Sequence, residues 1–248
     1  MKILVSGLGG HMGREVARLA QSGCRGARLA AGVDVNGCED FGVPCARSFS
    51  EAPADVDCIV DFSNHKATAE LLDFALAHRL PLVLATTGQT EEERAAIVKA
   101  AEQIPVFFAA NYSLGVALLL ELAKRAAAVM SDAEIEIVEI HHDRKLDAPS
   151  GTALALAEAI QEVRPDSTLS MGRSGHAKRT KQEIGIQSVR MGNIVGIHEV
   201  MVGTANETVT LRHEAYSRAL FAEGALAAAQ FLMGKGPGLY NMQSMLSL

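Results

Sequence analysis

The chain lacks an apolar run of membrane-spanning length, an excess of positive charge and a large number of cysteines. A helix that spans a membrane needs roughly 20 apolar residues in a row. Because the chain has no such run, we expect no membrane partner. The net charge of −6 gives no general positive field for nucleic acid. The short apolar N-terminus does not resemble a signal peptide. We therefore expect a cytoplasmic protein with neither a membrane nor a nucleic acid as partner.

Cysteine spacing fits neither a disulfide framework nor a metal site. The 4 cysteines fall in the first quarter of the chain, and neither His-Glu-x-x-His nor paired Cys-x-x-Cys occurs. We expect reduced, mostly structural thiols, no redox chemistry at cysteine and no bound metal. The cysteines are Cys24, Cys38, Cys45 and Cys58.

The first half contains alternating strand-like and helix-like segments. Short apolar runs predict strands, and stretches of helix formers between them predict helices. Such alternation winds into a parallel sheet through right-handed crossovers, so we expect an α/β fold with an N-terminal doubly wound, Rossmann-type domain. The predicted strands are 2–6, 27–33, 57–61, 82–85 and 105–108, and the predicted helices are 14–21, 66–78 and 91–103.

A glycine-rich turn follows the first predicted strand. Glycines let the backbone approach a pyrophosphate, and the helix N-terminus behind them supplies N–H donors. The spacing fits Gly7, Gly10 and Gly13, with Gly9 extra, and Asp34 ends the second strand where it can accept hydrogen bonds from an adenosine ribose. A tight turn without ligand is the alternative. The candidate dinucleotide-binding residues are Gly7, Leu8, Gly9, Gly10, His11, Met12, Gly13 and Asp34.

Two further loops follow later strands, at the edge where open α/β sheets bind ligands. Their small and hydroxyl-bearing side chains suit contact with a nicotinamide ring and its carboxamide, although plain turns are the alternative. These candidates are Ala85, Thr86, Thr87, Ala109, Ala110, Asn111 and Tyr112.

The second half combines helices with consecutive strands joined by short turns. Such strands favour a mixed or antiparallel sheet, and so a second, α+β domain. A last helix at 219–233 can return to cover the first sheet. We therefore place the dinucleotide-binding domain at 1–112 and 218–248, and a substrate-binding and oligomerisation domain at 113–217. In the second domain we expect helices from 113 and at 153–163, and strands near 133–140, 184–191, 194–202 and 207–213.

The segment from Glu139 to Thr152 concentrates acids, cations and helix-cap residues. Side chains alternate along a strand, so His141 and His142 at its end point to opposite faces and only one is needed as an acid. A helix begins near Ser150. Its first N–H groups, with nearby hydroxyls and the Lys145 ammonium, would hold a small carboxylate or phosphate. Singly, each feature reads as a surface or capping residue, but together they favour an anion site.

These motifs resemble those of the dihydrodipicolinate reductases, also called 4-hydroxy-tetrahydrodipicolinate reductases, of lysine and diaminopimelate biosynthesis. The resemblance covers essentially the full chain. The Glu139 to Ala153 pattern is highly specific to that family, whereas the glycine loop is not. The other matching motifs are Gly7 to Gly13, Asp61-Phe62-Ser63, Thr86-Thr87-Gly88 and Ala109 to Ser113.

The resemblance implies a homotetramer that uses NADH or NADPH to reduce 4-hydroxy-tetrahydrodipicolinate to tetrahydrodipicolinate. Hydride delivery to ring carbon four would leave a carbanion-like enamine that needs a proton, a step that a positioned acid accelerates about 10² to 10⁴ fold. The implied acid/base is His141, and Lys145 is a further proton donor. The implied dicarboxylate-binding residues are His142, Ser150, Gly151 and Thr152.

The residues after Asp34 bear on the choice of cofactor. Many family members carry Arg or Lys immediately after this acidic residue, where it meets the 2′-phosphate of NADPH, but here Val35 and Asn36 follow. Asp34 would repel a 2′-phosphate without an adjacent cation to offset it. We therefore expect a preference for NADH.

Two other functions fit parts of the sequence. A nicotinamide-dependent reductase of similar build would act on another small acid, such as a semialdehyde or an amino acid, but the segment from His141 to Thr152 argues against it. A nucleotide-sensing regulator would use the glycine loop and need no proton donor. Loss of His141 or Lys145 would then leave its function intact.

Overall fold

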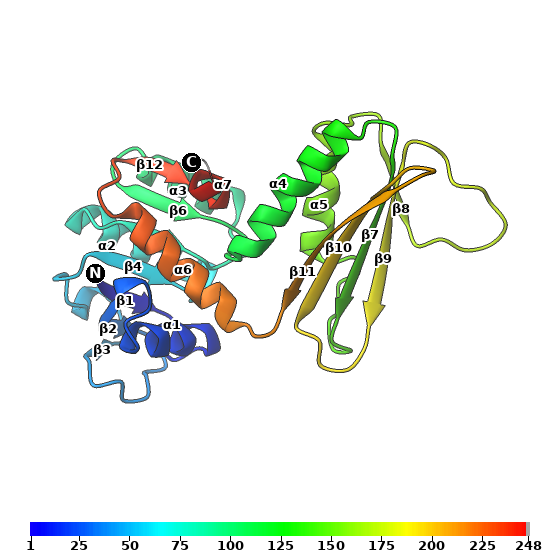
Figure 1. Cartoon of the computed structure of the whole chain (residues 1–248). Coiled ribbons are helices and arrows are strands. Elements are labelled where there is room, and N and C mark those ends of the chain that lie inside the picture. Colours follow the sequence, from blue (N-terminus) through cyan, green and yellow to red (C-terminus); the bar gives the residue numbers. More distant parts are fainter. Residues whose placement is uncertain (247–248) are drawn as a thin grey trace. The chain divides into compact units, whose positions relative to one another are not determined.

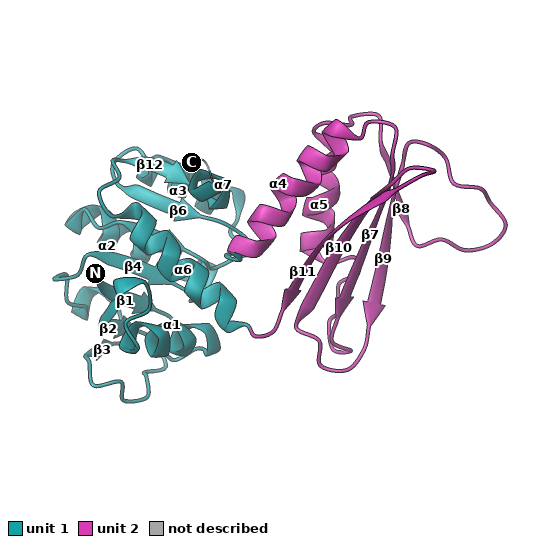
Figure 2. Cartoon of the chain, viewed as in Figure 1, with its two compact units in different colours: residues 1–113, 218–248 teal, residues 114–217 magenta. Residues whose placement is uncertain are grey.

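A computed structural model describes residues 1–246 of the chain (Figure 1). The chain divides into two compact units, Met1–Ser113 with Arg218–Leu248, and Leu114–Ser217, called here the first and second unit (Figure 2). The chain thus leaves the first unit once and returns to it for its last segment. Within residues 1–246, none of the helices is long and apolar enough to cross a membrane.

The first unit is built on a seven-stranded sheet. Its strand order is β12-β6-β5-β4-β1-β2-β3, and all neighbouring strands run parallel. The chain winds outward from β1 in one direction and then from β4 in the other, so the switch point lies between β1 and β4. The strands are β1 (Lys2–Ser6), β2 (Arg28–Val33), β3 (Cys45–Ala46), β4 (Cys58–Asp61), β5 (Leu82–Leu84), β6 (Pro105–Phe108) and β12 (Gly238–Tyr240).

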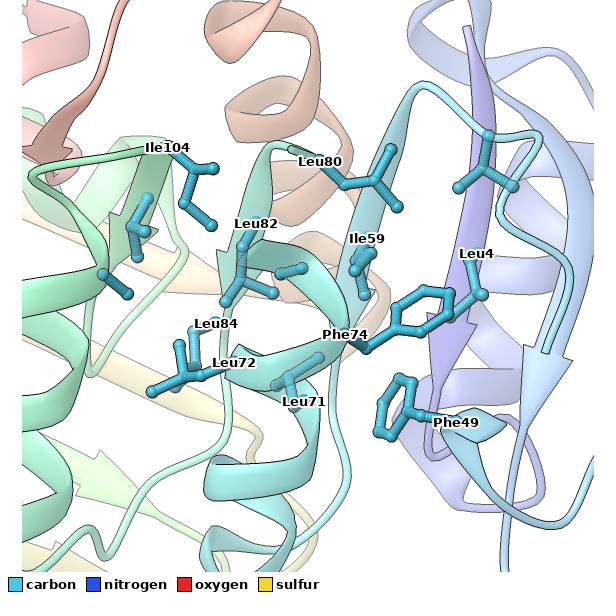
Figure 3. Close-up of a cluster of buried hydrophobic side chains, with 14 of the residues drawn as sticks. Leu4, Phe49, Ile59, Leu71, Leu72, Phe74, Leu80, Leu82, Leu84 and Ile104 are labelled. Carbon is cyan, nitrogen blue, oxygen red and sulfur yellow. The ribbon is translucent and has the colours of Figure 1, made fainter. Parts of the chain in front are cut away.

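Helices cover both faces of this sheet. Leu4, Ile59 and Leu82 pack with Phe74 of α2 in one buried cluster (Figure 3). Phe107 serves the other face, where its ring lies 6.1 Å from that of Phe231 in α6. Burying such a side chain stabilises the fold by about 1.5–3 kcal/mol. The helices are α1 (His11–Gln21), α2 (Thr68–His78), α3 (Glu91–Ala100), α6 (Ala219–Leu232) and α7 (Met242–Leu246), with short 3₁₀ turns at Cys24–Gly26, Phe49–Glu51 and His65–Ala67.

The second unit packs two helices on one face of a mixed sheet. The strand order is β11-β10-β7-β9-β8, with β10 antiparallel to both neighbours and β9 parallel to both. Along β7, every second residue is buried, and Ile135 and Ile137 pack against the helices. The elements are α4 (Leu114–Val129), β7 (Glu134–His141), α5 (Gly151–Gln161), β8 (Thr168–Met171), β9 (Glu183–Arg190), β10 (Gly196–Gly203) and β11 (Thr208–Ala215). The predicted fold class is confirmed.

Four short elements had not been predicted: β3, β8, β12 and α7. Each has only 2 to 5 residues. Unlike the equally short β4 to β6, which are apolar runs, these segments mix polar, small and apolar residues and show no clear strand or helix pattern. Their positions are therefore set by the sheet or helices that they join rather than by their own sequence.

The expectation of four reduced thiols was wrong for two of them. Cys38 and Cys45 form a disulfide, whereas Cys24 and Cys58 are free. The parallel pairing of Cys45 with Gly32 folds the segment after β2 back on itself and brings the Cα atoms of Cys38 and Cys45 to 6.2 Å. Spacing along the sequence did not show this approach, because a strand of two residues creates it.

Candidate active site

The glycine loop lies at the switch point of the first unit. Gly7 has a φ of +79°, and a Cβ there would lie 2.5 Å from the carbonyl oxygen of Phe62, which follows β4. A Cβ on Gly13 would lie 2.0 Å from the Gly7 oxygen. The backbones after β1 and β4 thus approach as closely as their atoms allow. Only glycine fits at these two positions.

The N-terminus of α1 faces this loop without a side-chain cap. Gly10 is the N-cap residue, and its own N–H donates to the Gly7 oxygen over 3.0 Å. A helix N-terminus whose N–H groups are not satisfied by a cap attracts phosphate through those groups and the helix dipole. The loop therefore fits the pyrophosphate of a dinucleotide.

Asp34 explains the extra glycine. Its Oδ2 accepts a hydrogen bond of 2.9 Å from the Gly9 N–H, and its Oδ1 accepts one of 2.9 Å from the Asn36 N–H. A Cβ on Gly9 would lie 2.9 Å from that Oδ2 and 2.6 Å from the Gly37 oxygen. The carboxylate thus fixes the glycine loop as well as facing the site.

A cavity of about 250 Å³ opens beside these residues. Of the predicted cofactor residues, Gly7, Gly10 and Asp34 line it. Leu8 is buried in the core, whereas His11 is exposed. The exposed Arg47, which follows β3, also lines the cavity and was missed. Sequence reasoning considered only cations adjacent to Asp34, and the pairing of β3 with β2 brings this one in from a distance. Further lining residues are Val35, Asn36, Ser48, Phe62 and Ser63.

The two candidate nicotinamide loops follow β5 and β6, and none of their residues lines this cavity. Thr86 is buried and Thr87 is exposed. Tyr112 is buried, and its hydroxyl donates to the carbonyl oxygens of Leu84 over 2.8 Å and Phe107 over 3.2 Å. This hydroxyl thus joins β5 to β6.

The second unit carries a buried carboxylate next to the candidate acid. Glu139 and His141 are two residues apart on β7 and so lie on the helix-covered face. His141 Nδ1 lies 2.6 Å from Glu139 Oε2, and because an ionised carboxylate only accepts hydrogen bonds, the nitrogen is the donor. Arg190 donates to both carboxylate oxygens over 2.8 and 2.7 Å. Burial raises the pKa of this carboxyl, but hydrogen bonds led by those of Arg190 outweigh burial and bring the pKa to about 2.

His141 is buried among charged neighbours. Burial lowers the pKa of its imidazole below the usual range, although Glu139 raises it, and the Lys145 and Arg190 charges lower it further. Its ring lies 5.1 Å from that of His198 on β10. Burial and the neighbouring His141 lower the pKa of His198 to about 4. Both rings are therefore neutral near pH 7.

Ser150 ties this centre to the start of α5. Its Oγ accepts a hydrogen bond of 3.2 Å from the Ala153 N–H and lies 2.9 Å from His198 Nε2. Its own N–H donates to Glu139 Oε1 over 3.2 Å. The predicted cap is confirmed as N-cap of α5. Gly151 is exposed, with open space where a Cβ would stand, and Thr152 is half-buried.

His142 and Lys145 lie on the loop that follows β7. The His142 N–H donates to the Ile194 oxygen over 2.8 Å, and its buried Nδ1 has no hydrogen-bond partner within residues 1–246. The Lys145 ammonium bonds both oxygens of Asp147 over 2.7 and 2.9 Å. Its charge is thus shared with a carboxylate of its own loop.

Sequence reasoning missed three residues of this centre: Glu139, Arg190 and His198. Glu139 was quoted only as part of a motif, although its position two residues before His141 on a strand already placed the two side chains on one face. Arg190 and His198 reach the centre through strand register, with His141 opposite Arg190 and Glu139 opposite His198. Register between distant strands is not visible in one sequence.

The first unit is doubly wound and carries a glycine loop, and the second unit places a buried histidine–carboxylate pair beside a helix N-terminus. Together they are typical of a two-domain oxidoreductase that depends on a nicotinamide nucleotide. Two family models match the chain, "Dihydrodipicolinate reductase, N-terminus" over residues 1–112 and "Dihydrodipicolinate reductase, C-terminus" over residues 115–246. The chain belongs to the dihydrodipicolinate reductase family. Its activity as an NADH- or NADPH-dependent 4-hydroxy-tetrahydrodipicolinate reductase of lysine biosynthesis, expected from the motifs, is confirmed.

Similar proteins span the same length. The 4-hydroxy-tetrahydrodipicolinate reductase of Caldanaerobacter subterraneus subsp. tengcongensis is 43% identical over 99% of this chain and 98% of its own, and that of Clostridium tetani is 38% identical over 100% and 97%. A dipicolinate-bound dihydrodipicolinate reductase from Paenisporosarcina sp. TG-14 superimposes with a TM-score of 0.78 at 25% identity, over 97% of both chains. A probable dehydrogenase from Thermotoga maritima, with a TM-score of 0.64 at 11% identity over 98% of this chain and 92% of its own, shares the fold.

Proposed function

We propose that this reductase protonates its substrate from the His141 centre of the second unit while the first unit holds the dinucleotide. The reduced nicotinamide supplies the hydride. The observation that carries the proposal is the bond between His141 Nδ1 and Glu139, beside the N-terminus of α5. It leaves the imidazole Nε2 as the atom that exchanges a proton with the substrate.

The substrate carboxylates are assigned to the start of α5 and to the loop before it. The first N–H groups of α5, at Gly151 and Thr152, together with the helix dipole, suit one carboxylate. His142, whose buried Nδ1 has no hydrogen-bond partner within residues 1–246, supplies a further polar atom. Dipicolinate, the ligand named for the Paenisporosarcina enzyme, is a dicarboxylate of this kind.

Two groups in this region can give a proton. In the free enzyme His141 is neutral, because burial lowers its pKa. A bound dianion raises the pKa of a nearby imidazole, so His141 takes up a proton from water when substrate binds and can then donate it. Lys145 is the second donor, and the incoming dianion competes with Asp147 for its ammonium.

The dinucleotide is assigned to the glycine loop, the α1 N-terminus and Asp34. A preference for NADH rests on the Asp34 carboxylate, which faces the cavity and accepts hydrogen bonds as a ribose 2′-hydroxyl donates them. Arg47, which lines the same cavity, is a cation that works against this preference. The loops after β5 and β6 are assigned to the nicotinamide end.

A homotetramer is supported by apolar side chains on the face of the second sheet that points away from α4 and α5. Helices α4 and α5 pack on the face of Ile135 and Ile137, while Val138 and Ile140 alternate with these residues and point the other way. Met201 and Val189 continue this second face onto β10 and β9. These apolar side chains remain partly exposed on a face that also carries the charged Glu136, and such side chains suit a contact between subunits.

The assay uses the full chain with substrate formed in situ by enzymatic condensation of pyruvate and aspartate semialdehyde, and follows oxidation of NADH and NADPH in parallel. We expect substrate-dependent oxidation, and a loss of about 10² to 10⁴ fold in kcat for His141→Ala and Lys145→Ala. Folded protein that binds dinucleotide but oxidises neither cofactor would overturn the proposal. Unchanged kcat in both variants would exclude these residues as donors.

A further inference from the structure

The Glu139–Arg190 pair touches every element that carries a predicted substrate-site residue in the second unit. The carboxylate, which is completely buried, accepts from His141 and from the Ser150 N–H at the start of α5. The guanidinium donates from Nη2 to the Asp147 carbonyl oxygen over 2.7 Å. Asp147 in turn binds the Lys145 ammonium. One ion pair thus connects the candidate acid, the anion site and the loop with the second donor.

A second glutamate–arginine pair on the same strand offers a comparison. Glu136 lies on the opposite face of β7 and pairs with Arg179. Arg179 also donates to the carbonyl oxygens of Ile135 and Glu183. Those contacts join strands, and none of them involves a predicted site residue. The two pairs therefore differ in what they hold.

We propose that Glu139 and Arg190 are positioning residues of the reductase. Glu139 keeps the proton of neutral His141 on Nδ1, so that Nε2 faces the substrate, and fixes the start of α5 at a set distance from that ring. Arg190 keeps the carboxylate ionised and holds the loop that carries Lys145. This inference rests on the proposed role of His141 as proton donor.

The surroundings of Nε2 agree with this orientation. A Cβ on Gly196 of β10 would lie 3.1 Å from His141 Nε2, so the glycine at this position leaves room beside the atom. A histidine whose Nδ1–H is held by a carboxylate has its tautomer fixed, and loss of that partner in other enzymes leaves the wrong nitrogen protonated. Room at Nε2 and a bond at Nδ1 therefore act together.

The charged groups that face His141 are known from each packed element. Glu139 on β7 is an anion, and it raises the His141 pKa. Arg190 on β9 and Lys145 on the loop after β7 lower it, and the neutral His198 on β10 lies beside the ring. Replacing Glu139 by a neutral residue removes the raising influence and leaves both cations.

The test is Glu139→Gln in the full chain, with Glu136→Gln as matched control. For Glu139→Gln we expect kcat to fall on the order of 10² fold, a lower apparent pKa in the kcat profile and unchanged dinucleotide affinity. Ring ¹⁵N NMR, with the His141 signals assigned by their loss in His141→Ala, should show Nδ1–H replaced by a tautomer mixture. Glu136→Gln should change neither the pH profile nor the His141 signals.

A double variant decides whether Glu139 acts through His141. If it does, Glu139→Gln combined with His141→Ala loses no more activity than His141→Ala alone. Losses that multiply, or an unchanged pH profile and tautomer in Glu139→Gln, would overturn the inference. Should Glu139→Gln lose its cooperative thermal transition, Arg190→Lys replaces it in the same cycle, with a smaller expected loss.

This inference and the proposed function fail in different ways. If activity is lost in His141→Ala but not in Glu139→Gln, His141 remains the proposed acid and the positioning role of Glu139 and Arg190 is wrong. If the protein reduces no substrate, the proposed function is wrong. The tautomer of His141 measured by NMR in the free enzyme still shows whether Glu139 orients the ring.

Discussion

The two helix N-termini assigned to anions are built in opposite ways. At α1 no side chain caps the helix, and glycines make the site by the absence of atoms, since a Cβ on Gly13 would collide with the Gly7 backbone. At α5 a serine caps the helix, Gly151 has open space, and the N–H of the capping serine donates to the buried Glu139 carboxylate. One site is made of backbone and the other of side chains.

This difference separates general from particular chemistry. Backbone N–H groups at a switch point bind the phosphates of any dinucleotide, so the glycine loop alone indicated only a class of protein. The Glu139 to Thr152 segment places the proposed proton donor beside the proposed anion site, an arrangement that suits few reactions. That segment alone pointed to one family.

The largest expected effect comes from replacing one glycine by alanine at each of the two helix N-termini. In Gly13→Ala the new Cβ meets backbone at 2.0 Å, so we expect a loss of several kcal/mol of stability, beyond the usual cost of about 1–3 kcal/mol for overpacking, and a large loss of dinucleotide affinity. In Gly151→Ala the new Cβ enters open space, so the melting temperature should not change and only the substrate KM should rise.

Thermal unfolding and dinucleotide titration of the two variants check this prediction. Equal melting temperatures for Gly13→Ala and Gly151→Ala would show that the glycine loop yields to a side chain. The claim that only glycine fits there would then be wrong.

The pH dependence tests the side-chain site next. His141 must carry a proton to donate it, and burial keeps its pKa in the free enzyme below the usual 6.5. The value of kcat/KM, which reports the free enzyme, should therefore fall as pH rises through that low pKa. The bound dianionic substrate raises the pKa of His141, so kcat should stay high up to a higher pH than kcat/KM does. Coincident midpoints in the two profiles would exclude charging of His141 by the substrate.

The sequence predicted the features that are contiguous in the chain, and it did not predict those that depend on the pairing of distant strands. The glycine loop, and the run from Glu139 to Thr152, are contiguous, so their residue types and spacing could be read directly. Arg190 and His198 lie 51 and 48 residues from the groups they bind, and only strand register unites them. Arg47 and the Cys38–Cys45 bond depend on β3, a strand too short to predict.

The smallest expected effects concern the dinucleotide's ribose, where backbone and side chain meet. Asp34→Ala removes the repulsion of a 2′-phosphate and should narrow a preference for NADH, but it also removes the bond to the Gly9 N–H and should weaken both cofactors. Arg47→Ala should lower kcat/KM with NADPH a few fold and leave NADH unchanged, because exposed charges interact weakly in water. Ratios of kcat/KM for the two cofactors, in the parent and both variants, measure this. If kcat/KM of the parent enzyme is tenfold higher with NADPH than with NADH, the expected preference for NADH is wrong. If Arg47→Ala then removes this preference for NADPH, the Arg47 side chain causes it rather than the glycine loop.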